Sequence, residues 1–416
     1  MREMKDSHIQ YLGKIPSHWS VSKYKYHATS RMGETLLAKE TSEGYDTEHM
    51  IPVYSATQDD SVFGYVGQAR VLLHKNDIVI PARGNSIGCA TLVKNDIATC
   101  TQTTICSTRI RDINPSFLYY CNWALKDEWY RYDGSAIPQI TVMQVDNNNL
   151  PYPSLQEQQK IADYLDRKCG EIDSVMADLQ EQIDKLEQYK RSVISETVTK
   201  GLNPKATMKD SGISYVGKIP ANWEVRPLYY YFKEGKKRNS KCAENNLLSL
   251  SYGKIIRKDI NMNGGLLPAS FSTYNIIEAD DIIIRPTDLQ NDKRSLRTGL
   301  VTEHGIITSA YIDLVPKANI CSRFFHYLLH SYDVKKVFYN MGNGVRQGLN
   351  FSEFSKLLIL APDLQEQQEI ADYLDKKCAE IESIIEDKKR QLEVVENYKK
   401  SLIYEYVTGK KEVSDE

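Results

Sequence analysis

No apolar run in the 416-residue sequence approaches the roughly 20 residues that a membrane-spanning helix needs. The first ten residues, MREMKDSHIQ, lack the apolar core of a signal peptide. The eight cysteines are scattered and include no C-x-x-C pair, so neither a zinc ribbon nor a disulfide framework is predicted. We therefore expect a cytoplasmic protein that does not contact a membrane.

An excess of charge of one sign is also missing. The chain has 53 basic and 55 acidic residues, for a net charge of −2. This excludes a uniformly basic DNA coat but leaves room for a basic face on an otherwise acidic molecule. With 41% hydrophobic and 26% charged residues the composition is globular, and the length favours two or three domains.

Catalytic motifs are absent too. The sequence has no Gly-rich phosphate loop followed by Lys-Ser or Lys-Thr, and no G-x-S-x-G elbow. The Asn114-Pro-Ser-Phe117 segment lacks the second proline of the amino-methyltransferase loop, and the nuclease-like Asp375-Lys-Lys377 falls on a predicted helix. His326 and His330 are spaced i, i+4 but have no third metal ligand. We expect a recognition protein without catalytic residues, metal or cofactor.

The strongest positive signal is an internal repeat. Residues 6–19, DSHIQYLGKIPSHW, recur as residues 210–223, DSGISYVGKIPANW. Residues 155–169 recur as residues 364–378 with 13 of 15 positions identical, as a comparison of LQEQQKIADYLDRKC with LQEQQEIADYLDKKC shows. The segments between these anchors have diverged. Each half therefore consists of a short N-terminal segment, here called the stub, followed by a variable module and a long helix. The two modules are expected to recognise different targets.

The two repeated segments that follow the modules are predicted to be long helices, over 155–199 and 364–408. Apolar residues recur at the steps of three and four that are typical of coiled coils, and Gly201 and Gly409 are suitable helix stops. The residues expected to pair the helices or to dock a partner are Ile172, Met176, Leu179, Ile183, Leu186, Ile381, Ile385, Leu392 and Val395. We predict that the helices pair antiparallel within one chain, about an approximate two-fold axis; a homodimeric coiled coil is the alternative.

The modules show short β-branched runs bounded by Gly, Asn, Asp and Pro, with one amphipathic helix each, at 116–127 and 322–337. Ser116 and Ser322 are the expected N-caps. The predicted fold class is therefore α+β: two similar mixed α/β domains separated by two long antiparallel helices. The expected boundaries are a stub at 1–20, a module at 21–150, a helix at 151–204, a stub at 205–223, a module at 224–362, a helix at 363–409 and a tail at 410–416.

Basic residues gather in the second module, which has 19 basic and 13 acidic residues over 224–361, against 12 and 14 over 20–150 in the first. They alternate with Asn, Gln, Ser and Asp in predicted loops. Positive charge suits phosphates, whereas Arg, Asn and Gln on a scaffold suit base edges. Both long helices are acidic, with 6 basic against 10 acidic residues in 155–199 and 7 against 11 in 364–408, and are expected to face solvent or a partner protein.

The chain resembles the specificity subunits of type I restriction–modification systems. The resemblance rests on the G-K-I-P-x-x-W segments at 13–19 and 217–223, on the P-x-L-Q-E-Q-Q-x-I-A-D-Y-L-D starts at 153–166 and 362–375, and on D-I-V-I-P-A-R-G at 77–84. It implies two target-recognition domains that each bind one half of a split sequence in double-stranded DNA. It also implies that the helices dock two methyltransferase subunits, that restriction subunits join the complex, and that adenine methylation and ATP-dependent cleavage belong to these partners.

The repeat suggests which residues contact DNA. Polar loop positions that differ between the halves should read bases, whereas the shared Gln139 and Gln347 should belong to the scaffold or bind phosphate. The predicted DNA-binding residues are Gln58, Arg83, Asn85, Ser86, Lys237, Arg238, Arg285, Gln290, Lys293, Arg294, Arg297 and Arg346. Two alternative functions stay open: the specificity part of a differently organised restriction–methylation enzyme, and a scaffold that assembles two proteins without reading DNA.

Overall fold

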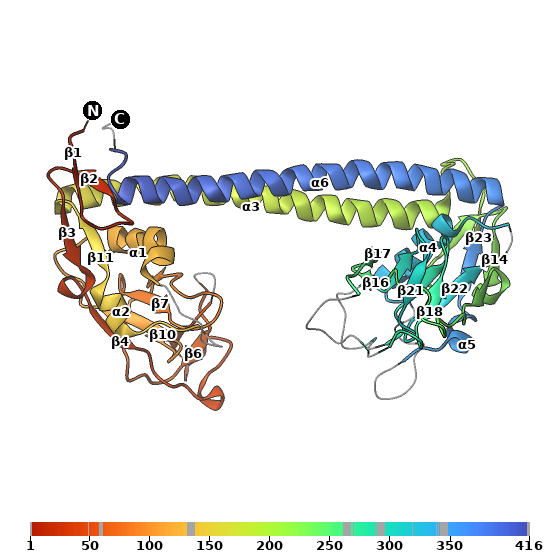
Figure 1. Cartoon of the computed structure of the whole chain (residues 1–416), viewed down its shortest axis with the longest axis horizontal. Helices are drawn as coiled ribbons and strands as arrows, with labels where there is room; N and C mark the ends of the chain where they lie inside the picture. Colours follow the sequence, from red (N-terminus) through yellow and green to blue (C-terminus); the bar gives the residue numbers. More distant parts are fainter. Residues whose placement is uncertain are drawn as a thin grey trace. The chain divides into compact units, whose positions relative to one another are not determined.

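Two long helices, α3 (Leu155–Lys200) and α6 (Leu364–Val407), carry the two modules (Figure 1). The computed structural model describes residues 2–48, 50–57, 61–130, 138–260, 268, 270–287, 289, 296–317, 319–337, 339, 341 and 348–413. It contains two compact units: residues 1–180 with 390–416 form unit 1, and residues 181–389 form unit 2. Each helix therefore contributes to both units.

Within each unit the beginning of one long helix packs against the end of the other. In unit 1, Ile172 of α3 shares a core with Leu402 and Ile403 of α6. In unit 2, Ile183 of α3 packs with Ile381 and Ile385 of α6. The two helices of one chain are thus antiparallel, which confirms the predicted intramolecular pairing.

The predicted pairing residues lie on the facing sides of the helices. Ile172, Leu179, Ile183, Ile381 and Ile385 are buried, whereas Met176, Leu186, Leu392 and Val395 are half-buried. Lysines are also present in the seam, where each pairs with an acidic residue of the other helix. Lys399 Nζ lies 2.6 Å from Asp173 Oδ1, and Lys190 forms an ion pair with Glu382.

The long helices end where glycines allow a left-handed residue. Gly201 and Gly409 have φ of +72° and +71°, a conformation that costs other residues about 1–2 kcal/mol. Each also packs against a stub: a Cβ on Gly409 would lie 2.5 Å from Pro16 Cδ, and one on Gly201 would lie 3.3 Å from the Trp223 ring.

Two glycines of the helical part should therefore respond oppositely to alanine. Gly170 lies inside α3 and a Cβ there meets nothing within 4 Å, so Gly170→Ala is expected to raise the free energy of unfolding by about 0.5–1 kcal/mol. Gly409→Ala is expected to lower it by at least about 1 kcal/mol. Denaturant unfolding measures both, and equal shifts for the two variants would contradict the assigned backbone conformations.

The two modules have the same sheet order. The central sheet is β4-β10-β7-β8 in unit 1 and β15-β22-β19-β20 in unit 2, all antiparallel. The strands of unit 1 are β1 Met4–Asp6, β2 Lys14–Pro16, β3 Ser20–Lys23, β4 Thr29–Met32, β5 Ile51–Tyr54, β6 Gly64–Val66, β7 Ile78–Pro81, β8 Thr91–Leu92, β9 Thr99–Cys100, β10 Thr104–Thr108 and β11 Asn149–Tyr152. Those of unit 2 are β12 Met208–Asp210, β13 Lys218–Pro220, β14 Glu224–Pro227, β15 Phe232–Glu234, β16 Leu248–Ser251, β17 Lys254–Arg257, β18 Asn275–Ile277, β19 Ile282–Ile284, β20 Thr298–Leu300, β21 Gly305–Ile307, β22 Ile312–Pro316 and β23 Leu358–Ala361.

The remaining pieces also correspond between the units. The stub hairpin β1-β2 matches β12-β13, and the pair β3-β11 matches β14-β23. The module helices are α1 (Pro115–Trp129) and α4 (Ser322–Val334), and the short helices are α2 (Val142–Asn147) and α5 (Phe351–Phe354). Short 3-10 helices lie at Tyr24–Tyr26, Ala38–Glu40 and Leu228–Tyr230.

The central strands β7 and β19 are buried on both faces, which explains their continuous apolar sequences. Ile78 and Ile80 face the main core of unit 1, with α1 and the long helices, whereas Val79 belongs to a smaller core with Cys106. In unit 2, Ile282 and Ile284 face the main core and Ile283 the smaller one. Both modules are therefore layered in the same way.

The predicted N-caps of the module helices were wrong. α1 begins two residues earlier than a Ser116 cap requires, because the side chain of Asn114 accepts the Phe117 N–H at 2.9 Å and Pro115 occupies the first turn. Cys321 precedes α4 and provides no side-chain cap, and Ser322 is the first helical residue. α4 ends at Val334, three residues before the predicted end.

One buried carboxyl gives the second module a pH dependence. Asp313 on β22 lies opposite Ile283, and burial, with Asp281 and Glu234 nearby, raises its pKa to about 8. The folded protein therefore holds a proton that the unfolded chain loses at its ordinary pKa, so stability falls as the pH rises from about 4 to about 8. Asp313→Asn should flatten that decline in melting temperature, and an unchanged decline would show that another group causes it.

Candidate nucleic-acid interface

A buried glutamine fixes the start of each long helix to its own module. Gln158 Oε1 accepts the Asn114 N–H at 2.8 Å, and its Nε2 donates to the Pro153 carbonyl at 2.9 Å. Gln367 repeats both bonds, accepting from the Cys321 N–H at 2.9 Å and donating to the Pro362 carbonyl at 2.9 Å. The repeated L-Q-E-Q-Q sequence thus holds the module helix and the long helix at a fixed geometry.

A second repeated contact lies eight residues further along each long helix. The hydroxyl of Tyr120 in α1 donates to Asp166 of α3 at 2.7 Å, and that of Tyr327 in α4 donates to Asp375 of α6 at 2.8 Å. In both cases burial is the main cause that raises the tyrosine pKa, so these hydroxyls stay protonated donors at neutral pH. The repeated sequences are therefore a frame that positions the module loops.

In the first module the predicted contacts lie in the loop that follows β7. Arg83 and Asn85 are exposed, on either side of Gly84 with φ of +81°. The backbone of Arg83 forms an isolated β-bridge with that of Gln139. Ser86 is instead buried, and its hydroxyl donates to the Ala56 carbonyl at 2.9 Å, so it holds the loop rather than facing a ligand. Gln58 lies outside the described residues.

In the second module Lys237 and Arg238 are exposed. Lys237 Nζ lies 3.5 Å from Glu278 Oε1, and Arg238 donates to the Thr273 carbonyl. Arg285 follows β19 and is half-buried. Gln290, Lys293, Arg294, Arg346 and Gln347 lie outside the described residues.

Arg297 is a correction to the prediction. Its side chain is completely buried, with Nε donating to the Tyr339 hydroxyl at 2.9 Å and an Nη donating to the Thr287 carbonyl at 2.5 Å. The buried Asp333 accepts the backbone N–H of Arg297 at 2.5 Å. These bonds hold the Arg297 side chain inside the module against Thr287 and Tyr339, so it does not reach a surface ligand.

Sequence reasoning missed the hairpin β16-β17. Its two-residue turn, Tyr252-Gly253, has φ of +46° and +80°, as a tight primed turn requires. The turn places Tyr252 at 81% exposure beside Lys254. The Tyr-Gly pair between the alternating segment LSLS and the β-branched segment KIIR was the signal that could have revealed the hairpin.

Comparisons with known proteins agree with this architecture. A family model described as the type I restriction modification DNA specificity domain matches residues 16–185 and 300–394. The type I restriction enzyme MjaVIII specificity subunit of Methanocaldococcus jannaschii is 24% identical over 419 residues, which cover 95% of this chain and 94% of that protein. The putative MjaX specificity subunit of the same organism is 26% identical over 308 residues, or 72% of this chain and 68% of that protein.

A solved structure shows the same fold. It is described as the structural basis underlying complex assembly and conformational transition of the type I R-M system, and it matches with a TM-score of 0.67 at 14% identity, covering 95% of this chain and 99% of that chain. Among the described residues, no helix combines the length and the apolar character needed to cross a bilayer. The chain belongs to the family of type I restriction–modification DNA specificity subunits.

Proposed function

We propose that this chain reads a bipartite DNA sequence, one half with each module, for a type I restriction–modification complex. The observation that carries the proposal is the combination of an identical frame with different loops. The two modules share their sheet order and their glutamine and tyrosine joints to the long helices. Their exposed polar loops differ in sequence and charge, as expected of two readers of unlike half-sites.

The exposed basic and amide side chains are the proposed DNA contacts. In the first module these are Arg83 and Asn85, and in the second they are Lys237 and Arg238, together with the half-buried Arg285. Changing a true base reader to alanine should cost about 1–3 kcal/mol of binding free energy and relax one target position. A residue whose loss weakens binding to all sequences equally contacts phosphate instead.

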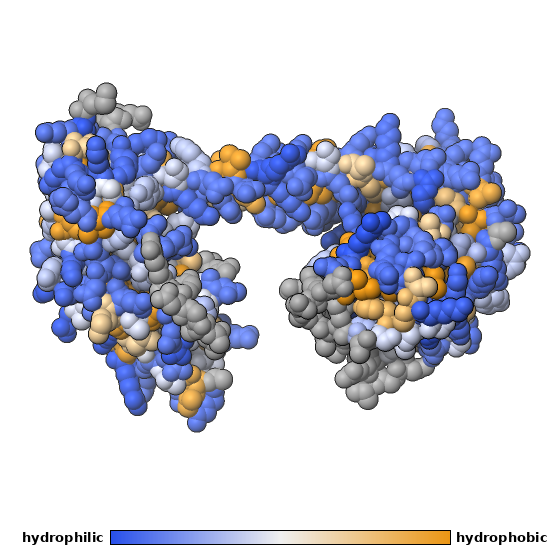
Figure 2. All heavy atoms as spheres, in the orientation of Figure 1, coloured by the Kyte–Doolittle hydropathy of each residue, from blue (hydrophilic) through white to orange (hydrophobic). Residues whose placement is uncertain are grey.

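The long helices are the proposed docking surface for two methyltransferase subunits, with restriction subunits joining the larger complex. Both helices leave apolar side chains exposed at corresponding positions of the repeat. Val175 and Ile384 are 49% and 45% exposed, and Tyr189 and Tyr398 are 51% and 55% exposed. Figure 2 shows hydrophobic surface on the helical part of the chain. An apolar site that occurs twice in one chain suits two copies of one partner.

A length change in the helices tests the bipartite reading. We would insert seven residues into both helices, between residues 180 and 181 and between residues 389 and 390, which preserves the antiparallel register. At 1.5 Å per residue the insertion adds roughly 10 Å, or about 3 base pairs, to the separation of the modules. Sequencing of methylated sites in the host genome should reveal half-sites moved apart by that amount.

Insertion into α3 alone is the matched control, because it breaks the register and should abolish methylation. An unchanged half-site spacing with the double insertion would refute the proposal that the helices set the distance. Binding that depends on salt but not on sequence would instead favour an assembly scaffold.

A further inference from the structure

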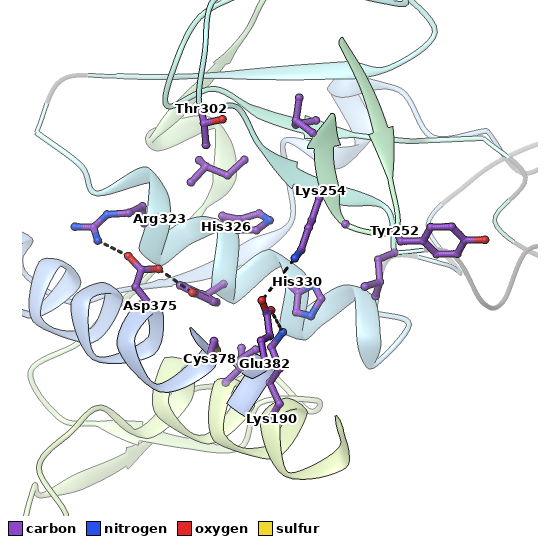
Figure 3. Close-up of a pocket in the computed structure, with 16 residues that line it drawn as sticks. Lys190, Tyr252, Lys254, Thr302, Arg323, His326, His330, Asp375, Cys378 and Glu382 are labelled. Carbon is purple, nitrogen blue, oxygen red and sulfur yellow. Dashed lines mark hydrogen bonds and ion pairs between the residues drawn. The ribbon is translucent and has the colours of Figure 1, made fainter. Parts of the chain in front are cut away.

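Unit 2 contains a cavity of about 390 Å³ where the hairpin β16-β17, α4 and both long helices meet. Figure 3 shows His326 and His330 projecting into it from α4, with Lys254 of the hairpin and Lys190 of α3 both directed to Glu382 of α6. Lys254 Nζ lies 3.6 Å from Glu382 Oε2, and Lys190 also pairs with Glu382. The cavity thus has one charged wall, and Ile194, Ile255, Leu296 and Leu300 form apolar walls.

The corresponding place in unit 1 is filled by aromatic side chains of the chain itself. The shared tyrosines Tyr120 and Tyr327 align α1 with α4 at an offset of 207, which makes Trp123 the counterpart of His330. By the same offset Tyr119 is the counterpart of His326. Two large aromatic residues in the first module are therefore replaced by two smaller imidazoles in the second, and the cavity lies where that volume is lost.

A lysine paired with a carboxylate lies beside this position in both units. In unit 1, Lys399 Nζ lies 5.6 Å from the centre of the Trp123 ring and 2.6 Å from Asp173. Lys190 and Glu382 of unit 2 occupy the same positions of the repeat as Lys399 and Asp173. A lysine over the face of an indole is a favourable cation–π arrangement. Unit 2 keeps the lysine but has the smaller imidazole of His330 in place of the indole.

One polar atom in the cavity also lacks a partner. His326 Nε2 is buried and has no hydrogen-bond partner among the described residues. Burial lowers the pKa of His326 to about 4, and the Thr298 backbone is the main group that opposes this shift. The ring is therefore neutral at pH 7, and in the tautomer that carries its proton on Nδ1 the Nε2 atom is an acceptor. A buried acceptor without a donor favours a ligand that brings an N–H group.

We propose that this cavity binds a planar heteroaromatic ring that carries an N–H donor, with indole as the simplest example. The ring would occupy the volume that Trp123 fills in unit 1, lie near the Lys190 ammonium, and donate its N–H to His326 Nε2. Such a ring comes either from a free small molecule or from a tryptophan side chain of a partner protein. The inference rests on the cavity of unit 2 and its comparison with unit 1, and does not depend on how the modules read DNA.

Titration of the full-length protein with indole, followed by calorimetry, tests this site. We expect saturable binding of one indole per chain, and at least tenfold weaker binding of 1-methylindole, which has the same ring but no N–H donor. N-acetyltryptophanamide distinguishes the two sources. Binding as tight as that of indole points to a partner's tryptophan, and a preference for indole points to a free molecule.

Two variants provide matched controls. His330→Trp should fill the cavity, abolish indole binding and leave the circular dichroism spectrum unchanged, whereas Trp123→His should create a second indole site in unit 1. No detectable binding, equal binding of indole and 1-methylindole, or binding retained by a folded His330→Trp variant would each overturn the proposal. The methylindole comparison uses the unmodified protein, so the test remains decisive if a variant fails to fold.

Discussion

Replacing Arg297 by methionine is expected to lower the free energy of unfolding of the second unit by about 3–5 kcal/mol, although the sequence around it reads as a surface loop. The guanidinium is buried and donates to the Tyr339 hydroxyl and the Thr287 carbonyl. Its loss takes the guanidinium donor away from the Thr287 carbonyl and removes the positive charge near the buried Asp333. Burial already raises the pKa of Asp333, and Arg297 is among the groups that oppose this.

Denaturant unfolding measures this effect, with Arg83→Met as the matched control, since Arg83 is exposed and its replacement should change stability by less than about 0.5 kcal/mol. Adding Asp333→Asn to Arg297→Met should recover part of the loss, because the double variant no longer buries an uncompensated carboxylate. A loss below about 1 kcal/mol for Arg297→Met would argue against a supporting role for this side chain.

Gln367→Leu is expected to destabilise the same unit by about 2–4 kcal/mol. Leucine has a similar volume but makes neither bond of the glutamine, so the Cys321 N–H and the Pro362 carbonyl are left buried without a partner. Gln158→Leu should have a similar effect in unit 1, where the Asn114 N–H and the Pro153 carbonyl would lose their bonds to the glutamine.

The neighbouring glutamine is the control for this prediction. Gln368 is exposed, so Gln368→Leu should alter the unfolding midpoint little. If Gln367→Leu and Gln368→Leu behaved alike, the repeated glutamine would not be the joint between helix and module.

The frame of this protein could be predicted because its sequence occurs twice in the chain. The repeated L-Q-E-Q-Q segments located both long helices to within one residue of the observed α3 and α6. The spacing of Ile172, Ile183 and Ile381 predicted which faces pair. The single apolar stretches around Val79 and Ile283 indicated strands, since a strand buried on both faces has no polar alternation.

The contacts of individual polar residues could not be predicted, because sequence does not show which loop closes over which side chain. Arg297 and Ser86 lie in segments typical of exposed loops, yet partners 42 and 30 residues away bury them. Ser116 seemed a suitable cap, but Asn114 caps the helix two residues earlier, and Pro115 favours that earlier start. The cavity could not be predicted either, because the sequence does not show that the hairpin β16-β17, α4 and both long helices meet around His326 and His330.

Each unit is completed by helix residues from the other half of the chain, which limits how such genes can recombine. An exchange confined to residues 21–150 or 224–362 replaces one module and leaves the α3–α6 seam as it was. A crossover inside a helix changes one side of pairs such as Lys399 with Asp173, and the imported helix then has to match a partner that was not inherited with it. New specificities are therefore expected to spread by exchange of modules at the borders of the repeats.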